Sequence, residues 1–299
     1  MFTKRGKVAI ITRTKNRNIL LKRALESVVN QTFSDWIMVI VNDGGDSGEI
    51  DKLVESYQEK FTEKITVIHN QTSIGMEAAS NKGIQNSSSE YVVIHDDDDS
   101  WHKDFLKTTI GYMDQCPYDN VKGVITHSIK VVEKIDNDKV IELRKAPFNS
   151  SLDSITLYRM CASNLFPPIS FLYKRSVFDE IGMYNSDLPV LGDWDFNLRF
   201  MGKFDIHVIK DSLAFYHHRL VSKSSDYSNS VIGGIDKHKM YDTILRNKYL
   251  RDDISKNKIG IGLLVNISKS VEEINRRFFL FDRVINYAKY KLKKFPFIK

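Results

Sequence analysis

Short apolar runs alternate with amphipathic segments through the first third of the chain. Four runs rich in β-branched residues predict buried strands, at residues 7–12, 36–41, 65–69 and 91–95. The segments between them predict helices, at residues 19–30, about 50–61 and 76–87, and in the first of these Leu21, Ala24, Leu25 and Val28 share one face. Strands that alternate with helices require crossover connections. The pattern therefore predicts an α/β fold with a mostly parallel sheet flanked by helices on both faces.

The pattern changes in the middle of the chain. Residues 124–144 predict a hairpin that turns at Asp136, Asn137 and Asp138, and short strands are expected at residues 169–173, 206–209 and 213–217. A helix is expected from Gly192 to about Met201, and from about residue 228 the pattern is wholly helical. We therefore expect two parts, a sheet domain over residues 1–227 and a basic helical extension over residues 228–299.

Composition is that of an ordinary globular protein. Of the 299 residues 42% are hydrophobic and 27% are charged, which excludes disordered and collagen-like chains and allows a sizeable core. Two cysteines cannot build a disulfide framework, so we expect a reducing compartment, and no cysteine pair suggests a structural zinc site. The chain starts without a signal-peptide pattern and has no apolar run of membrane-spanning length, so a cytoplasmic location is expected.

The charge balance favours anionic partners. A net charge of +6 suits a nucleic acid, a membrane surface or a phosphorylated substrate. Nucleic acid is disfavoured, because the predicted sheet domain has no basic stripe interleaved with aromatic residues. Residues 276–299 mix aromatic, aliphatic and basic residues, with Asp282 as the only acid. This tract has two interpretations: a helix lying on the anionic inner face of the cell membrane, or a basic helix packed on the domain or on a second subunit of a homo-oligomer.

Polar residues follow the predicted strands, where sheets of this kind bind their ligands. Arg13 and Lys15 follow the first strand, Asp43 the second, and the run Asp96–Asp99 the fourth. Four adjacent carboxylates repel one another unless a cation neutralises them, and Mg²⁺ or Mn²⁺ takes such oxygen ligands. In an extended segment Asp96 and Asp98 would face one side together. A solvated acidic turn is the alternative, which the position directly after a buried strand disfavours.

Two further clusters have candidate chemistry. Asp193 opens a predicted helix, so it is either an N-cap or a general base whose pKa is raised by its neighbours. His217 and His218 end a predicted strand, and the alternation along that strand allows only one of them to face a site. A histidine there is either a nitrogen ligand beside a carboxylate-bound cation or an ordinary core residue.

These segments together resemble the nucleotide-sugar-dependent glycosyltransferases of family 2, which have the GT-A fold. The resemblance covers residues 7–218 and includes the Val41-Asn42-Asp43-Gly44-Gly45 turn, Gly75, Asn81-Lys82-Gly83, the Glu90–Asp99 strand and the Gly192–Leu198 segment, in the order in which the family has them. It implies an inverting, metal-dependent enzyme that transfers a hexosyl or N-acetylhexosaminyl group from a UDP-sugar.

The resemblance also implies roles for individual residues. Asp43 is similar to the uracil-binding aspartate, and Asp96 and Asp98 to the paired aspartates that hold the ribose and a divalent cation, Mn²⁺ or Mg²⁺. Asp193 is similar to the catalytic base, and His218 or His217 to a late metal-contacting histidine. The implied nucleotide-binding set is Thr12, Arg13, Lys15, Asp43, Asn81, Lys82, Asp96 and Asp97; the metal set is Asp98 and His218; and the acceptor set is Trp194 and Asp195.

The chain departs from the family pattern at three places. Many members have a glutamate before the catalytic aspartate, where this chain has Gly192, and many have an arginine where it has Ser80. A proline that often follows the aspartate run is replaced by His102 and Lys103. Acceptor contacts from position 192 are therefore in question, and a diphosphate contact has to come from Lys82 or another residue.

We expect the enzyme to build a bacterial surface glycan, such as an O-antigen or capsule, on a lipid-linked acceptor. One alternative is a sugar nucleotidyltransferase, but residues 12–17 lack the glycine-rich approach expected of a triphosphate loop. The other alternative is a non-catalytic module that binds nucleotide sugars or glycans, which the presence of both Asp98 and Asp193 disfavours.

Overall fold

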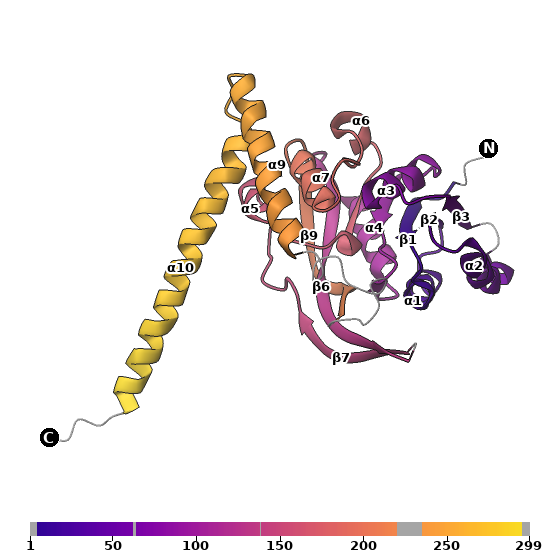
Figure 1. The fold of residues 1–299 in the computed structure, drawn as a ribbon, viewed down its shortest axis with the longest axis horizontal. Helices are drawn as coiled ribbons and strands as arrows, with labels where there is room; N and C mark the ends of the chain where they lie inside the picture. The colour runs from indigo at the N-terminus through magenta and orange to yellow at the C-terminus, as the bar shows by residue number, and fades with distance from the viewer. Residues whose placement is uncertain (1–4, 62–63, 138, 220–234, 295–299) are drawn as a thin grey trace.

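The computed structural model of the chain describes residues 5–61, 64–137, 139–219 and 235–294. A curled sheet of nine strands forms its centre, in the order β3-β2-β1-β4-β8-β6-β9-β5, with β7 paired to β6 (Figure 1). The strands are β1 (Val8–Thr14), β2 (Trp36–Asp43), β3 (Ile65–Asn70), β4 (Tyr91–Ile94), β5 (Ser100–Trp101), β6 (Val121–Asp136), β7 (Lys139–Pro147), β8 (Phe171–Lys174) and β9 (Asp205–Arg219).

Helices pack on both faces of this sheet. They are α1 (Asn18–Val29), α2 (Ser47–Phe61), α3 (Met76–Gln85), α4 (Phe105–Gln115), α5 (Leu157–Ala162), α6 (Val177–Ile181) and α7 (Gly192–Met201). Two further helices, α9 (Ile235–Ser255) and α10 (Ile261–Lys294), follow toward the C-terminus. Strand β1 shows why the strands are continuously apolar: Ile10 packs in the core under α1, α2 and α4, while Ile11 packs in the core under α3, α5 and α7. Both faces of the sheet are therefore buried around β1, whereas β7 is mostly exposed.

The sheet is parallel in its first half and mixed in its second. Strands β3, β2, β1 and β4 are parallel neighbours, which confirms the predicted crossover connections. Strand β8 then runs antiparallel to both β4 and β6, and β5 runs antiparallel to β9. The α/β class with helices on both faces is confirmed, and the antiparallel part brings the end of β9 to the ends of β1 and β4.

The predicted elements of the middle region are present with shifted bounds. The hairpin over residues 124–144 is formed by β6 and β7, and Asp138, predicted in its turn, lies outside the described residues. The strands predicted at 206–209 and 213–217 are one strand, β9, which continues across a break because its pairing with β6 shifts register around His127. The strand predicted from Ile169 begins at Phe171, since Pro168–Ser170 forms a 3₁₀ turn.

The C-terminal helices are attached to the sheet part through buried contacts. Arg246 of α9 donates to the carbonyl oxygens of Cys161 and Ala162, and Leu245 and Val265 are buried. Beyond this contact α10 runs clear of the sheet (Figure 1). The predicted boundary between residues 227 and 228 lies outside the described residues and stays a prediction. In the part of the chain that the structure describes, we find no helix that could span a membrane.

Candidate active site

A cavity of about 420 Å³ opens at the carboxyl ends of β1, β2 and β4. The start of α7 and Tyr216 of β9 close it from the other side. The fold therefore collects residues from five distant parts of the chain at one end of the sheet, where ligand sites of α/β proteins lie. Seven of the residues predicted for the site line this cavity: Arg13, Lys15, Asp43, Asp96, Asp97, Asp98 and Asp193.

Asp43 is held rigidly at the end of β2. Its carboxylate accepts hydrogen bonds from Asn70 Nδ2 at 2.9 Å, Ser73 Oγ at 2.6 Å, and the backbone nitrogens of Ile74 and Gly75 at 2.8 and 3.0 Å. Burial would raise the pKa of this carboxyl, but the four hydrogen bonds outweigh burial and lower the pKa. Asp43 is thus a fixed anion, and a nucleobase N–H would have to take the place of one donor, of which the rotatable Ser73 hydroxyl is the simplest to displace.

The run Asp96–Asp99 forms a tight turn after β4, in which Asp99 N donates to Asp96 O at 3.2 Å. Exposure still alternates: the side chains of Asp96 and Asp98 are 24% and 14% exposed, whereas Asp97 and Asp99 are buried. Burial, followed by the charges of Asp98 and Asp96, raises the pKa of Asp99 well above its usual range. The two partly exposed carboxylates are therefore the ones available to a ligand in the cavity.

Arginine side chains neutralise the exposed aspartates. Arg13 Nε donates to Asp96 Oδ1 at 2.9 Å, and Arg17 Nη1 lies 3.7 Å from Asp98 Oδ2. Asp98 Oδ2 also accepts from Arg219 Nη2. Burial would raise the pKa of Asp98, but Arg219 and Arg17 lower it. Asp98 is therefore an ionised carboxylate whose present counter-ions are guanidinium groups.

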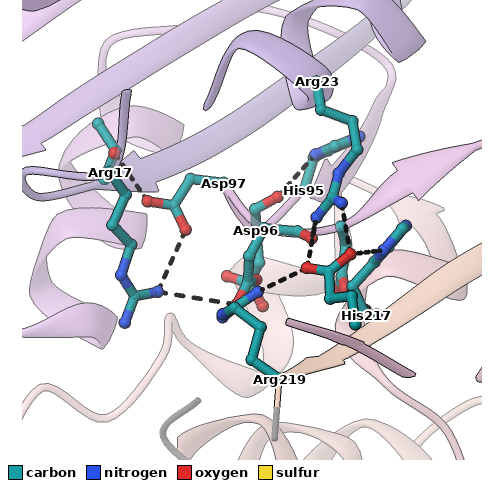
Figure 2. A network of polar contacts seen from close by, with 11 residues as sticks. Arg17, Arg23, His95, Asp96, Asp97, His217 and Arg219 are labelled. Carbon is teal, nitrogen blue, oxygen red and sulfur yellow. Dashed lines mark hydrogen bonds and ion pairs between the residues drawn. The ribbon is translucent and has the colours of Figure 1, made fainter. Parts of the chain in front are cut away.

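A buried network positions Arg219. Figure 2 shows Arg23, His217 and Arg219 converging from three sides, and their common partner is the Glu133 carboxylate of β6. The distances to Glu133 are 2.6 Å from Arg23 Nη1, 2.8 Å from His217 Nδ1 and 3.2 Å from Arg219 Nη1. Glu133 is 1% exposed. The network fixes the end of β9, so Arg219 meets Asp98 at a defined place.

Replacing Glu133 with glutamine is expected to lower the free energy of unfolding by about 3 kcal/mol at pH 7. Burial raises the pKa of Glu133, but His217 and Arg23 overcome this effect and depress the pKa from 4.5 to about 2. A depressed carboxyl pKa contributes stability above the unfolded value of 4.5, and this stability is lost as the pH falls towards 2. Urea unfolding at pH 7 and pH 3 measures both effects.

Glu142, exposed and paired with Lys145 at 2.8 Å, supplies the matched control for this measurement. Glu142→Gln is expected to change the free energy of unfolding by less than about 1 kcal/mol at either pH, as for other surface ion pairs. If the Glu133 variant were equally destabilised at pH 7 and pH 3, the carboxylate charge would not be what stabilises the network.

His218 faces the side of β9 opposite to His217. It packs edge-on against Tyr216 with ring centroids 4.3 Å apart, and its buried Nε2 has no hydrogen-bond partner among the described residues. Burial, and next the charge of Lys130, lowers the pKa of His218 to about 4. His218 is therefore neutral and has a free nitrogen, but it does not line the cavity.

The donors at the end of β4 fit a divalent cation that is shared with a phosphate. Within the described ranges no three His, Cys, Asp or Glu side chains converge as a complete metal site. Hard cations that bind with nucleotides commonly take one or two carboxylates and complete their coordination with phosphate oxygens. Asp98, ionised and partly exposed to the cavity, has the chemistry of such a ligand.

Asp193 lies in the first turn of α7 with its carboxylate facing the cavity. Its Oδ2 accepts from Asn164 Nδ2 at 2.7 Å, and Asn164 Oδ1 accepts from Asn197 Nδ2 at 3.0 Å. Burial raises the pKa of Asp193. The two asparagines fix the side chain in one orientation, and the raised pKa makes the carboxylate a stronger base than a solvated one.

Six predicted site residues lie outside the cavity lining. Trp194 Nε1 donates to Met160 O at 2.7 Å, and Asp195 accepts from Arg199 and Tyr249, so both side chains point into the core rather than toward an acceptor. Asn81 exchanges two hydrogen bonds with the Tyr184 backbone, and Lys82 donates to Asn70. The full set is Thr12, Asn81, Lys82, Trp194, Asp195 and His218.

The cavity also contains residues that the sequence did not point to. Glu77 of α3 is 3% exposed, and burial raises its pKa to about 7 although Arg13 opposes this shift. Tyr216 of β9 and His238 of α9 line the opposite wall. The available signal for Glu77 was its place in the first turn of a helix that follows a strand end, in Gly75-Met76-Glu77. Arg13 Nη1 donates to Ser80 Oγ at 2.8 Å, so a guanidinium lies beside position 80 although that residue is serine.

Comparison with known proteins agrees with this geometry. A family model described as Glycosyl transferase family 2 matches residues 9–182. A PGL/p-HBAD biosynthesis glycosyltransferase of Mycobacterium bovis is 24% identical over 286 residues, which cover 94% of this chain and 97% of the relative.

Two solved structures share the fold. S. aureus TarS 1-349 in complex with UDP-GlcNAc has a TM-score of 0.55 at 19% identity, and the match covers 72% of this chain and 60% of that one. Mannosyltransferase PcManGT from Pyrobaculum calidifontis, in complex with GDP-Man and Mn²⁺, has a TM-score of 0.58 at 15% identity, with 89% and 70% covered. The chain thus spans less than two thirds of the TarS chain. These likenesses confirm the GT-A fold expected from the sequence.

Proposed function

This chain belongs to glycosyl transferase family 2, and we propose that it is an inverting, metal-dependent enzyme that moves a sugar from a UDP-sugar to a hydroxyl group of a glycan. The observation that carries the proposal is the single cavity that holds Asp43, Asp96–Asp98 and Asp193 together. A fixed anion for the nucleotide, carboxylates for a cation and a buried base are the three parts that such a transfer needs. Family membership favours this activity over nucleotidyl transfer and over a non-catalytic module.

The proposed reaction is one displacement at the anomeric carbon of the donor. Asp193 accepts the proton of the acceptor hydroxyl while that oxygen forms the new bond to the anomeric carbon. The bond from the anomeric carbon to the diphosphate oxygen breaks, and its electron pair leaves with the nucleoside diphosphate. The configuration at carbon is inverted. Asn164 holds Asp193 in line, which supports catalysis by orientation.

The diphosphate end of the donor needs positive charge. We propose that Asp98 holds Mn²⁺ or Mg²⁺ there, with phosphate oxygens completing the coordination and His218 as a second candidate ligand. A bound divalent cation would neutralise the charge that develops on the leaving diphosphate. Arg13, Lys15 and Arg17 line the same side of the cavity and add further positive charge toward the nucleotide.

The donor is tested by thermal shift with a panel of nucleotide sugars and free nucleotides, each with Mn²⁺ and with EDTA. We expect UDP and at least one UDP-sugar to raise the melting temperature, and Mn²⁺ to increase that shift. A shift with GDP-mannose but not with UDP would replace the proposed UDP-sugar by a GDP-sugar as the donor. PcManGT, which has the same fold, is in complex with GDP-Man. No shift with any nucleotide would contradict it.

We propose that the acceptor is a lipid-linked saccharide of a surface polysaccharide, met at the cytoplasmic face of the membrane. The relative of Mycobacterium bovis is named for a role in PGL/p-HBAD biosynthesis, which supports a biosynthetic glycosyltransferase. The exposed face of α10 supports the location, since Ile274, Phe278 and Phe279 are 52%, 67% and 64% exposed beside Arg276 and Arg277. Apolar and basic residues side by side on a helix suit an anionic bilayer surface.

Reversing three charges on this helix tests the location. Arg276, Arg277 and Arg283, all exposed, are replaced with glutamate, and Lys22, Lys103 and Lys107 are replaced in the control. Because each basic residue near an anionic surface contributes about 1 kcal/mol, we expect binding to phosphatidylserine vesicles to fall at least about tenfold in the first variant only. Equal binding of both variants in co-sedimentation would remove the membrane proposal and leave α10 as a protein-contact helix.

A further inference from the structure

Glu77 is a buried carboxylate with too few partners. It extends from the first turn of α3 into the cavity wall and is 3% exposed. Its Oε2 accepts no hydrogen bond from any described residue, and the ion-pair contact to Arg13 Nη1 is long, at 3.6 Å. Arg13 instead makes its shorter hydrogen bonds to Asp96 Oδ1 and Ser80 Oγ. A buried acceptor in this state is costly unless a ligand supplies the missing donor.

The start of α7 leaves space for this carboxylate. A Cβ atom built on Gly192 would lie 2.6 Å from Glu77 Oε1, closer than real contacts allow. Any side chain at position 192 would therefore push Glu77 away. Gly192 precedes Asp193, so the Glu77 carboxylate is held directly against the residue before the proposed base.

The position of Glu77 along the cavity indicates what it meets. Gly75, two residues before it, donates its backbone nitrogen to Asp43 at the nucleotide end. On its other side Glu77 lies against Gly192, the residue before Asp193 at the start of α7. A donor whose nucleotide is at Asp43 and whose anomeric carbon faces Asp193 has its sugar ring between those two points. This step rests on the proposed function.

The charges around Glu77 indicate whether its missing hydrogen-bond donor is a phosphate or a sugar hydroxyl. Burial raises the pKa of Glu77, the nearby Arg13 cation lowers it, and the carboxyl groups of Asp193, Asp96 and Asp195 raise it further. A phosphate beside so many carboxylates is disfavoured. An uncharged hydroxyl group can donate to a carboxylate or accept from a carboxylic acid. The chemistry therefore suits a sugar hydroxyl.

We infer that Glu77 binds a hydroxyl group of the transferred sugar and so selects which sugar the enzyme accepts. Oε2 has only the long contact to Arg13 and accepts no hydrogen bond from the residues that the structure describes, and Gly192 keeps open the space in which the carboxylate lies. Sites built to hydrogen-bond a substrate hydroxyl discriminate strongly against the analogue that lacks it, because the buried partner is then left unpaired.

The test uses the UDP-sugar that the wild-type enzyme transfers, together with its 3-, 4- and 6-deoxy analogues. Three variants are compared: Glu77→Gln, Glu77→Ala, and the pair Glu77→Ala with Gly192→Glu, which returns a carboxylate to the same space from α7. Glu90→Gln is the control, because Glu90 is an exposed carboxylate at the opposite end of β4. The readouts are kcat/KM for each donor and the Kd of UDP.

For the wild type we expect kcat/KM to fall at least about 10²-fold for one deoxy donor. Glu77→Ala is expected to lower kcat/KM for the parent sugar by a similar factor and to remove the discrimination, with the Kd of UDP unchanged. Glu77→Gln should keep part of the preference, and the double variant should regain part of what Glu77→Ala loses. The Glu90 control should match the wild type.

Two results would overturn the inference. Unchanged discrimination in Glu77→Ala would show that another residue binds the hydroxyl. A parallel loss of UDP affinity would show that Glu77 supports the nucleotide end. If the wild type transferred no sugar from any donor, the proposed function would fail and the inference with it, and that result would be evident before any variant was made.

Discussion

Asp193→Asn is expected to lower kcat by about 10³-fold while leaving the fold and nucleotide binding intact. The amide has the shape of the carboxylate and can still meet Asn164, but it cannot accept the acceptor proton. The lost rate is the part supplied by general-base catalysis. Burial raises the pKa of Asp193, which makes its carboxylate a better proton acceptor than a solvated one. The asparagine side chain has no such basic group.

The measurement is single-turnover transfer from the UDP-sugar, with the Kd of UDP determined in parallel. Asp195→Asn serves as the control, because Asp195 lies two residues further on and is bound to Arg199 and Tyr249 in the core. Asp195→Asn is expected to lower the free energy of unfolding while leaving the transfer rate nearly unchanged. Loss of UDP binding in Asp193→Asn would contradict its assignment as the base and make it a nucleotide ligand.

The first half of the fold was predictable because its signals are local. Strands β1, β2 and β4 are buried on both faces, and the residues that follow them lie at one end of a parallel sheet by topology alone. Arg13, Asp43 and Asp96 were placed together on that argument, and the cavity contains all three. The alternation of side chains along β9 was an equally local signal, and His217 and His218 lie on opposite faces of that strand, as it predicts.

The remaining features depend on contacts between distant segments. Glu133 is a charged residue near the end of the long strand β6, and nothing near it in sequence shows that Arg23 and Arg219 will meet it. Glu77 likewise becomes a candidate only when α7 is seen to approach α3 at Gly192. The interpretation of Trp194 and Asp195 as acceptor contacts followed from their place beside Asp193, whereas a helix turns adjacent side chains to different faces, and these two face the core.

Charge compensation explains how the neighbouring carboxylates of Asp96, Asp97 and Asp98 can share one cavity. Asp96 has Arg13, Asp97 has Thr14 and Arg17, and Asp98 has Arg17 and Arg219 as partners. A cation bound at Asp98 would compete with the two guanidinium groups, and these groups would then be released toward an anionic diphosphate. We therefore propose that these arginines pair with the aspartates and, once a cation is bound, with the diphosphate.

Asp98→Ala is expected to lower kcat/KM by about 10³-fold and to remove the effect of Mn²⁺ on UDP affinity. For the wild type we expect Mn²⁺ to tighten UDP binding at least about tenfold over EDTA, which corresponds to about 1.4 kcal/mol. The variant should bind UDP equally with both, because the carboxylate that connects cation and protein is gone. Titration calorimetry with UDP in Mn²⁺ and in EDTA measures the difference without relying on turnover.

Folding of the Asp98 variant is expected to survive, since Arg219 keeps its contact with Glu133 at 3.2 Å and Asp98 is not fully buried. Asp153→Ala, which removes an exposed aspartate paired with Lys210, is the control and should retain the Mn²⁺ effect. If Mn²⁺ still tightened UDP binding to Asp98→Ala, the cation would have another ligand, and Asp96 with its partly exposed carboxylate would be the next to replace. If Mn²⁺ had no effect even on the wild type, the arginines alone would neutralise the diphosphate, and the metal-dependent part of the proposal would be withdrawn.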